Sequence, residues 1–290
     1  MKPDSSEISS YYARGNLLSR LKAALAQDGV DPENPTAEAL APYDQFHGRG
    51  LEATLELAGL VAAGATDHIL DIGSGIGGPA RYFASRFGCK VSGIDLTAEF
   101  CDVARHLTRL IGLENRVTFE VGDALAMPFA DATFDGAYSM NVSMNIADKV
   151  GLYREIHRVL KPGAWLVLSE VAKGAEVLPG SAMAAGELPE LAYPTPWAAS
   201  ASTSFLATPE ETRVFLLAAG IEVISLRSSV EEARAFADRS RAMVERGEKP
   251  PHRAVMLIHG ENAAQAMSNT ARALSQGSIV PIEVLGRKRG

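Results

Sequence analysis

The chain has 290 residues, of which 47% are hydrophobic and 22% charged, a balance typical of a globular protein rather than a disordered one. Its 28 basic and 35 acidic residues leave a formal charge of −7, so electrostatics give no reason to expect nucleic-acid binding. Two cysteines, no apolar run long enough for a membrane span and no secretory signal together predict a cytoplasmic protein in a reducing compartment.

Short β-rich runs alternate with helical segments from about residue 67 onward. Strands are expected over His68–Ile72, Lys90–Asp95, Val117–Val121, Phe134–Tyr138 and Trp165–Ser169, with helices between them over Pro79–Phe87, Thr97–Ile111 and Lys149–Leu160. Such alternation predicts an α/β protein with a parallel sheet and helices on both faces.

The alternation is interrupted at two places and then resumes. Residues 1–60 are expected to form helices with a loop at Gly29–Pro35, and residues 172–208 are rich in Ala, Pro and Ser. After them we expect helices over Pro209–Ala219, Ser229–Glu245 and Asn262–Leu274, and strands over Ile221–Leu226 and Ile279–Leu285.

A glycine-rich loop joins the first strand to the first helix of the repeat. It runs Asp71-Ile72-Gly73-Ser74-Gly75-Ile76-Gly77-Gly78-Pro79, and its glycines permit a tight turn that brings a ligand close to the backbone. Gly73, Gly75 and Gly78 also satisfy the G-x-G-x-x-G dinucleotide pattern, and Asp95 at the end of the second strand can accept hydrogen bonds from ribose hydroxyls. These features alone fit either a nicotinamide cofactor or another adenosine ligand.

Three further details separate these two ligands. Asp71, two residues before Gly73, would repel a pyrophosphate but suits a ligand that carries positive charge. Asp123 follows the third strand, where it can accept a hydrogen bond from an adenine amino group, and Lys161-Pro162-Gly163 ends a helix before the fifth strand.

Together, these segments resemble the successive motifs of class I S-adenosylmethionine-dependent methyltransferases over about residues 41–228. The motifs are Asp71-Ile72-Gly73-Ser74-Gly75, Asp95, Gly122-Asp123-Ala124 and Leu160-Lys161-Pro162-Gly163, with Ala164 where the family usually has a second glycine. The resemblance implies a Rossmann-like, mostly parallel seven-stranded sheet with helices on both faces and a helical cap.

A narrower resemblance is to sarcosine/dimethylglycine-type N-methyltransferases. It rests on the segment Tyr43–Gly50, on Tyr193–Trp197 and on the C-terminal stretches around Gly260–Asn262 and Pro281–Val284. We therefore expect four regions: an N-terminal helical cap and gate (1–60), an S-adenosylmethionine-binding core (61–171), a lid or substrate insertion (172–208), and the completion of the core with a helical insertion (209–290).

The family resemblance implies cofactor roles for Asp71, Gly73, Gly75, Asp95, Leu96, Asp123, Ala124 and Met140. Asp71 is expected to face the ammonium group of the cofactor, directly or through water. Asp95 is expected to hold the ribose and Asp123 the adenine amine, while Met140 lies under the sulfonium.

The methyl acceptor is expected at the carboxyl ends of the strands, beside the loop after the fourth strand. Candidate catalytic residues are His47, Tyr43 and Asn145, although an asparagine cannot act as a base at neutral pH. Candidate substrate-binding residues are Asn141, Arg49, whose guanidinium matches a carboxylate, and Tyr193 and Trp197, which can form an aromatic wall for a cation.

The leading prediction is methyl transfer from S-adenosylmethionine to a small molecule, with the nitrogen of a small amine or amino acid as acceptor. The alternatives are C- or O-methylation of a quinone-like or polyketide-type product, a nicotinamide-dependent oxidoreductase, and a non-catalytic adenosine-binding module. The six histidines and two cysteines show no metal-binding spacing, so no metal is expected. The predicted partners are a small-molecule acceptor and, in a homodimer, a second copy of the chain, with no nucleic acid and no membrane.

Overall fold

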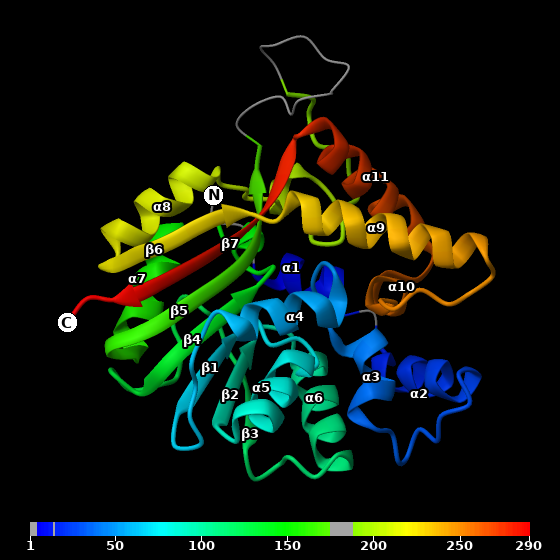
Figure 1. Ribbon diagram of the computed structural model, residues 1–290, viewed down its shortest axis with the longest axis horizontal. Coiled ribbons are helices and arrows are strands. Elements are labelled where there is room, and N and C mark those ends of the chain that lie inside the picture. The colour runs from blue at the N-terminus through cyan, green and yellow to red at the C-terminus, as the bar shows by residue number, and fades with distance from the viewer. Residues whose placement is uncertain (1–4, 14, 175–187) are drawn as a thin grey trace.

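The computed structural model describes residues 5–13, 15–174 and 188–290, and its centre is a twisted sheet of seven strands (Figure 1). The strands are β1 (His68–Ile72), β2 (Lys90–Asp95), β3 (Val117–Val121), β4 (Phe134–Met140), β5 (Leu160–Lys173), β6 (Ile221–Ser228) and β7 (Ile279–Lys288). They are ordered β3-β2-β1-β4-β5-β7-β6, and β7 runs antiparallel to both of its neighbours. This is the mostly parallel seven-stranded sheet that the sequence predicted.

Helices cover both faces of the sheet because successive side chains of a strand point to opposite sides. Ile69 of β1 packs into a core with α4 (Gly50–Gly59), α5 (Gly78–Phe87) and α6 (Ala98–Leu110). Leu70 and Ile72 belong to the opposite core, which α7 (Lys149–Val159) and α8 (Pro209–Ala218) complete. The central strands are therefore buried on both faces.

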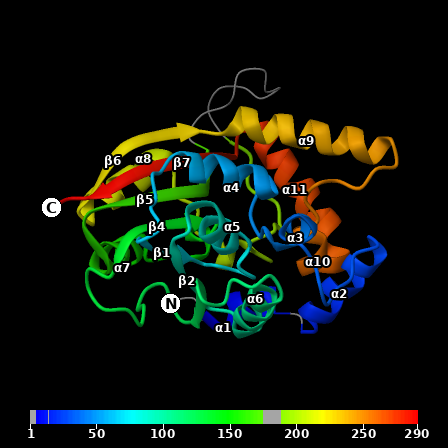
Figure 2. The same ribbon diagram turned by 60° about the horizontal axis from the view of Figure 1, so that its bottom comes forward.

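A helical cap lies at one end of the molecule, where Figures 1 and 2 both place α2, α3 and α10 together. Its helices are α1 (Ser5–Tyr12), α2 (Leu17–Gln27), α3 (Ala37–Asp44), α9 (Val230–Glu245), α10 (Ala254–His259) and α11 (Ala263–Gln276). Leu21 of α2, Leu40 of α3 and Leu257 of α10 share a hydrophobic cluster with Phe100 and Leu107 of α6. Among the residues that the structure describes, no helix has the length and apolarity to cross a membrane.

Helices α4 and α10 differ from the sequence-based expectations, and one predicted region lies partly outside the described residues. Helix α4 packs on the sheet core through Ala53 and Leu57, although the sequence analysis placed it in the cap. Helix α10 was not predicted, because its six residues follow two prolines and are too few to show a helical period. The predicted insertion at 172–208 lies partly outside the described residues, since positions 175–187 are not among them.

Candidate active site

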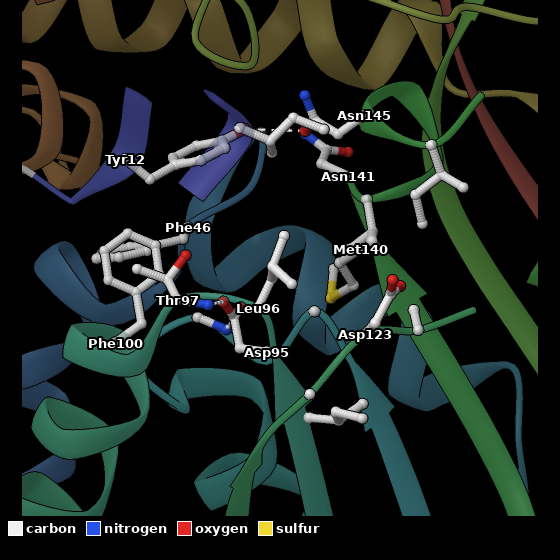
Figure 3. A pocket seen from close by; sticks show the side chains of 18 residues that line it. Tyr12, Phe46, Asp95, Leu96, Thr97, Phe100, Asp123, Met140, Asn141 and Asn145 are labelled. Atoms are coloured by element: carbon white, nitrogen blue, oxygen red, sulfur yellow. Dashed lines mark hydrogen bonds between the residues drawn. The ribbon is translucent and has the colours of Figure 1, made fainter. Parts of the chain in front are cut away.

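A cavity of about 790 Å³ opens at the carboxyl ends of β1, β2, β3 and β4 (Figure 3). We call it the cofactor cavity. It lies where the strand order reverses between β1 and β4, the position at which open α/β sheets bind ligands. Seven of the eight predicted cofactor residues line it: Gly73, Gly75, Asp95, Leu96, Asp123, Ala124 and Met140.

The glycine loop needs glycine for two separate reasons. Gly73 has a φ of 72° and Gly75 a φ of 52°, a backbone region that residues with a Cβ rarely adopt. A Cβ on Gly73 would also lie only 2.3 Å from Cγ2 of Val142. The loop is fixed in this shape by the amide of Gly73, which donates to the carbonyl of Ile94 at 2.8 Å.

Asp95 joins the glycine loop to the start of α6. Its Oδ2 accepts a hydrogen bond from the amide of Gly75 at 2.8 Å, and its Oδ1 accepts one from the amide of Thr97 at 2.8 Å. Burial raises the pKa of this carboxyl, and the two amide donors oppose that rise. A carboxylate oxygen can accept more than one hydrogen bond, so Asp95, which lines the cavity, has the acceptor chemistry that a pair of ribose hydroxyls requires.

Asp71 lies behind the glycine loop and is only 3% exposed, so it does not itself line the cofactor cavity. Its Oδ2 and the phenol oxygen of neighbouring Tyr138 make no hydrogen bond of good geometry, but the two side chains interact, and Tyr138 stabilises the ionised form of Asp71. Burial raises the pKa of Asp71 to about 7. A buried carboxyl without a full set of partners is a good site for a cationic group of a ligand.

Asp123 and Met140 occupy the other side of the cavity. The Oδ1 of Asp123 accepts from the amide of Leu125 at 2.9 Å, which fixes a turn after β3 and leaves Oδ2 available. Figure 3 shows the Met140 side chain projecting into the cavity between Leu96 and Asp123.

Three aromatic side chains that the sequence analysis did not single out also line this cavity: Tyr12 of α1, Phe46 and Phe100. The Phe46 and Phe100 rings meet edge to face with centroids 5.1 Å apart, and Tyr12 lies 6.0 Å from Phe100. Two of the three come from outside the predicted core, so no motif of the sheet could have identified them.

A second cavity of about 1,090 Å³ adjoins the first, and we call it the acceptor cavity. Tyr12, Phe46 and Asn141 line both cavities, so ligands in the two spaces would meet at these side chains. Its other walls are mainly apolar and come from the loop after β4, the segment around Trp197 and helices α9, α10 and α11, including Met144, Trp197, Phe236, Val255, Ile258 and Leu274.

The two charged side chains in the acceptor cavity are already bonded within the protein. Glu170 accepts from the hydroxyl of Ser139 at 3.0 Å and from the amides of Val142 and Ser143 at 3.1 Å. Arg49 donates to Glu56 at 2.7 Å and to buried Glu283 at 3.0 Å. Arg49 lines this cavity, but its guanidinium is already paired with two protein carboxylates, so its binding of a ligand carboxylate stays a prediction.

His47 lines the acceptor cavity, as predicted, but its surroundings oppose a role as a base. Its Nε2 lies 3.1 Å from Oγ1 of Thr54, and its Nδ1 lies 3.2 Å from the carbonyl of Gly48. Burial lowers the pKa of His47 to about 3. An imidazole with both nitrogens engaged and so low a pKa accepts a proton poorly at neutral pH.

His252 lines the same cavity and was missed by the sequence analysis, since no motif surrounds it. Its Nε2 lies 2.9 Å from the carbonyl of Gln45, so this nitrogen carries the hydrogen in the neutral ring. The other nitrogen, Nδ1, is then unprotonated, and burial lowers the pKa of the ring.

Asn141 and Asn145 are both used to hold the loop after β4. Asn145 donates to the carbonyl of Trp197 at 2.7 Å and accepts from the hydroxyl of Tyr12 at 3.0 Å (Figure 3). Asn141, in the orientation that hydrogen bonding favours, donates to Ser169 and accepts from the amide of Gly48, both at 3.1 Å. Asn145 thus connects α1, the loop and the segment around Trp197, which is a positioning role.

Two predicted residues lie away from the cavities. The hydroxyl of Tyr43 donates to Asp28 at 2.8 Å, and Tyr43 lines neither the cofactor nor the acceptor cavity, so we remove it from the catalytic set. Tyr193 packs against the cluster that contains Trp197, and only Trp197 of this pair lines the acceptor cavity. Across the described residues, no group of three His, Cys, Asp or Glu side chains could hold a metal ion.

Comparison with known proteins assigns the core of the chain. Residues 70–168 match the family model described as "Methyltransferase domain". The methyltransferase GfsG of Streptomyces halstedii is 33% identical over 175 residues, which are 58% of this chain and 58% of that protein. Sterol 24-C-methyltransferase of Eremothecium gossypii is 40% identical over 104 residues, 36% of this chain and 28% of that protein. Phosphoethanolamine N-methyltransferase 3 of Arabidopsis thaliana is 36% identical over 124 residues, 43% of this chain and 25% of that protein.

Residues 70–168 are thus similar to a methyltransferase domain, and these relatives are all described as methyltransferases. The chain spans 58% or less of the length of these relatives. The structure of the [4+2]-cyclase SpnF is similar with a TM-score of 0.67 at 21% identity, covering 99% of this chain and 98% of that one. A structure from Galdieria sulphuraria, described as a candidate sarcosine dimethylglycine methyltransferase, has a TM-score of 0.60 at 16% identity, covering 82% and 84%. These two likenesses concern the fold alone.

Proposed function

We propose that this protein transfers the methyl group of S-adenosylmethionine to a bulky, mainly apolar small molecule held in the acceptor cavity. The observation that carries the proposal is the shared wall of the two cavities, formed by Tyr12, Phe46 and Asn141. A cofactor in one space and an acceptor in the other would be in contact there, as an in-line methyl transfer requires.

The residues of the cofactor cavity fit S-adenosylmethionine group by group. Asp95 offers two oxygens for the ribose hydroxyls, and Gly73 and Gly75, which lack a Cβ, let the methionine part approach the backbone. Asp71, which is buried behind the glycine loop, is proposed to stabilise the positive charge of the ammonium group from there. When bound, S-adenosylmethionine supplies a methyl group that its sulfonium already activates.

The acceptor is proposed to be apolar because the acceptor cavity offers little to a small charged molecule. In the part of the chain that the structure describes, both charged side chains of this cavity are bonded to protein groups. A free amino acid would bring a carboxylate and an ammonium without finding an unpaired partner for either, which is costly in a buried site.

His252 is proposed to orient the acceptor rather than to take its proton, because burial lowers the pKa of this ring as it does that of His47. Its Nδ1 is the unprotonated nitrogen of a ring that the carbonyl of Gln45 orients, so it can accept a hydrogen bond from a hydroxyl or an amine. The nitrogen of an amine that carries a large apolar group is therefore the second candidate acceptor.

The fold does not decide the activity, because a structure described as a [4+2]-cyclase has the same fold. The relatives also differ in acceptor, since one is described as a sterol C-methyltransferase and another as a phosphoethanolamine N-methyltransferase. Binding of the cofactor and transfer of its methyl group must therefore be measured separately.

The test is incubation with methyl-labelled S-adenosylmethionine and two acceptor panels, one of apolar phenols, sterols and isoprenoids and one of glycine, sarcosine and phosphoethanolamine. We expect transfer to members of the first panel. Higher kcat/KM for the second panel would overturn the apolar acceptor. Binding of S-adenosylhomocysteine in calorimetry with no transfer to either panel would overturn methyl transfer itself.

A further inference from the structure

One wall of the acceptor cavity runs along helix α9 and sets a length scale for what the cavity holds. Ser229, Ala233 and Phe236 all line the cavity. Residues spaced by four and then by three positions lie on the same face of a helix. Seven residues at about 1.5 Å each span roughly 10 Å, so this stripe is about two helical turns long, from Ser229 at the start of α9 to Phe236.

His252 marks one end of the stripe. Its ring meets the Phe236 ring edge to face, with centroids 6.4 Å apart. The carbonyl of Gln45 holds its Nε2 at 2.9 Å, and a Cβ on Gly50 would lie 3.2 Å from its Cγ and Cδ2. These contacts cover Nε2 and the Cγ–Cδ2 bond, and they leave the unprotonated Nδ1 uncovered. Because Gln45 directly precedes Phe46 of the shared wall, this end of the stripe is the one beside the cofactor cavity.

Ser229 marks the other end. Its side chain is buried, since the residue is only 2% exposed, and its amide donates to the carbonyl of Pro281 in β7 at 2.9 Å. The hydroxyl does not cap α9, although serine is a common capping residue at this position. Among the described residues it has no hydrogen-bond partner, so a buried hydroxyl faces the cavity unused.

Both polar atoms are open to the cavity. Across the part of the chain that the structure describes, the unpartnered side-chain atoms that a water-sized molecule cannot reach include neither Oγ of Ser229 nor Nδ1 of His252. Ala233 and Phe236 make the wall between these two atoms apolar. A ligand that leaves a buried polar atom unpaired loses binding energy, so a matching ligand carries a polar group at each end and none between.

We infer that the acceptor is an elongated, mainly apolar molecule with a hydroxyl or amino group at one end and a second oxygen roughly 10 Å away. This inference rests on the proposed function, since it describes the molecule that the acceptor cavity holds. The first group donates to Nδ1 of His252, which carries no hydrogen of its own. The second oxygen pairs with the hydroxyl of Ser229, which can donate or accept.

Ser229 is therefore a specificity-determining residue. A molecule of the same length that ends in a methyl group leaves the Ser229 hydroxyl without a partner, and a shorter molecule does not reach it. A site built to bond a ligand oxygen discriminates against the analogue that lacks it.

The test is calorimetric titration of the full chain, saturated with S-adenosylhomocysteine, with octanol and with the terminal diol of octane. We expect saturable binding of both alcohols. Ser229→Ala should weaken binding of the diol by roughly two- to tenfold, because only the diol has an oxygen for Ser229. Affinity for octanol should stay within about twofold of wild type. His252→Phe keeps an aromatic ring but removes Nδ1, so it should weaken binding of both alcohols by roughly two- to tenfold.

The matched control is Ser275→Ala, which removes a hydroxyl of α11 that is bonded to the carbonyl of Arg272 on the protein surface. It should leave both affinities unchanged. Equal losses for the two alcohols in Ser229→Ala, or no loss for either, would overturn the second oxygen site. Unchanged affinities in His252→Phe would overturn the hydroxyl end.

The same titrations separate this inference from the proposed function. Binding of octanol without an advantage of the diol that depends on Ser229 would overturn only the inference. Failure of both alcohols to bind wild-type protein would overturn it together with the apolar acceptor. A protein that binds the diol through Ser229 but transfers no labelled methyl group would overturn the proposed function alone.

Discussion

The cofactor cavity and the acceptor cavity adjoin each other but are built in different ways. The cofactor cavity takes both of its carboxylates, Asp95 and Asp123, and its glycines from short loops at the ends of β1, β2 and β3. The acceptor cavity draws its walls from α1, the segment around Trp197, α9, α10 and α11. The charged groups of the first site thus come from a short stretch of sequence, while the second site is assembled from distant segments and is mainly apolar.

This difference indicates in which cavity ligand binding depends on individual side chains. In the cofactor cavity Asp95 holds the glycine loop and is proposed to hold the ribose as well. One substitution there should therefore weaken cofactor binding strongly. In the acceptor cavity many apolar side chains line the space, so affinity for the acceptor should depend more on the shape of the cavity than on any one side chain. Four predictions test this comparison.

The largest effect is expected for Asp95→Ala. The substitution removes both oxygens that hold the amides of Gly75 and Thr97 and that are proposed to hold the ribose. Loss of charge-assisted hydrogen bonds of about 1.5–3 kcal/mol corresponds to roughly 10- to 150-fold weaker binding of S-adenosylhomocysteine in calorimetry. Asp102→Ala, which removes an exposed carboxylate of the neighbouring helix, is the control and should bind normally. Unchanged affinity in Asp95→Ala would contradict the ribose assignment.

The pH dependence of cofactor binding should follow Asp71. Its native pKa of about 7 lies above the usual value near 3.9, so without ligand the native state binds the proton more tightly than the unfolded state. Stability of the free protein should therefore fall as pH rises from about 4 to about 7, and change little from this group above that. An ammonium favours the ionised carboxylate, so affinity for S-adenosylhomocysteine should rise by up to about tenfold per pH unit until about pH 7. Asp71→Asn should make that profile flat, and a wild-type profile without this rise would contradict the pairing.

A larger side chain in the acceptor cavity should weaken binding of the acceptor and leave cofactor binding unchanged. Ala233 of α9 lines this cavity, so Ala233→Phe should raise the acceptor KM by roughly tenfold, the scale expected for overpacking of about 1–3 kcal/mol. Affinity for S-adenosylhomocysteine should stay within about twofold of wild type. Ala235→Phe, on the exposed side of the same helix, is the matched control. If Ala233→Phe weakened cofactor binding by the same factor as it raised the acceptor KM, the two cavities would not be separate binding sites.

The smallest effect is expected at the wall that the cavities share. Tyr12→Phe removes only the hydrogen bond from the phenol to Asn145, worth about 0.5–1.5 kcal/mol, and keeps the ring. Because Tyr12 lines both cavities, cofactor Kd and acceptor KM should both rise by about two- to tenfold. Steady-state kinetics together with calorimetry measure the two values. A change in only one of them would show that Tyr12 serves one cavity.

Much of the fold could be predicted from sequence because its signals are local. The bounds of β1, β2 and β3 were predicted to the residue, since each strand is a short run containing β-branched residues and is bounded by turn residues. Strand β5 begins five residues earlier than expected, at Leu160 rather than Trp165, and the pairing of β4 with β5 shifts between Phe134 and Gly136. Such an irregularity depends on the partner strand and leaves no mark in the sequence of either strand alone.

The sequence by itself determined the glycine loop, the carboxylates at the strand ends and therefore the placement of the cofactor cavity, because a parallel sheet brings the ends of its strands to one edge. Only the tertiary structure decided the acceptor side. In the folded protein Tyr43 lies outside both cavities, and Arg49 is bonded to Glu56 and Glu283. Burial lowers the pKa of His47, and His252 lines the acceptor cavity. The physical reason is that burial and pairing depend on which distant segments pack together, and no local pattern of residues encodes that.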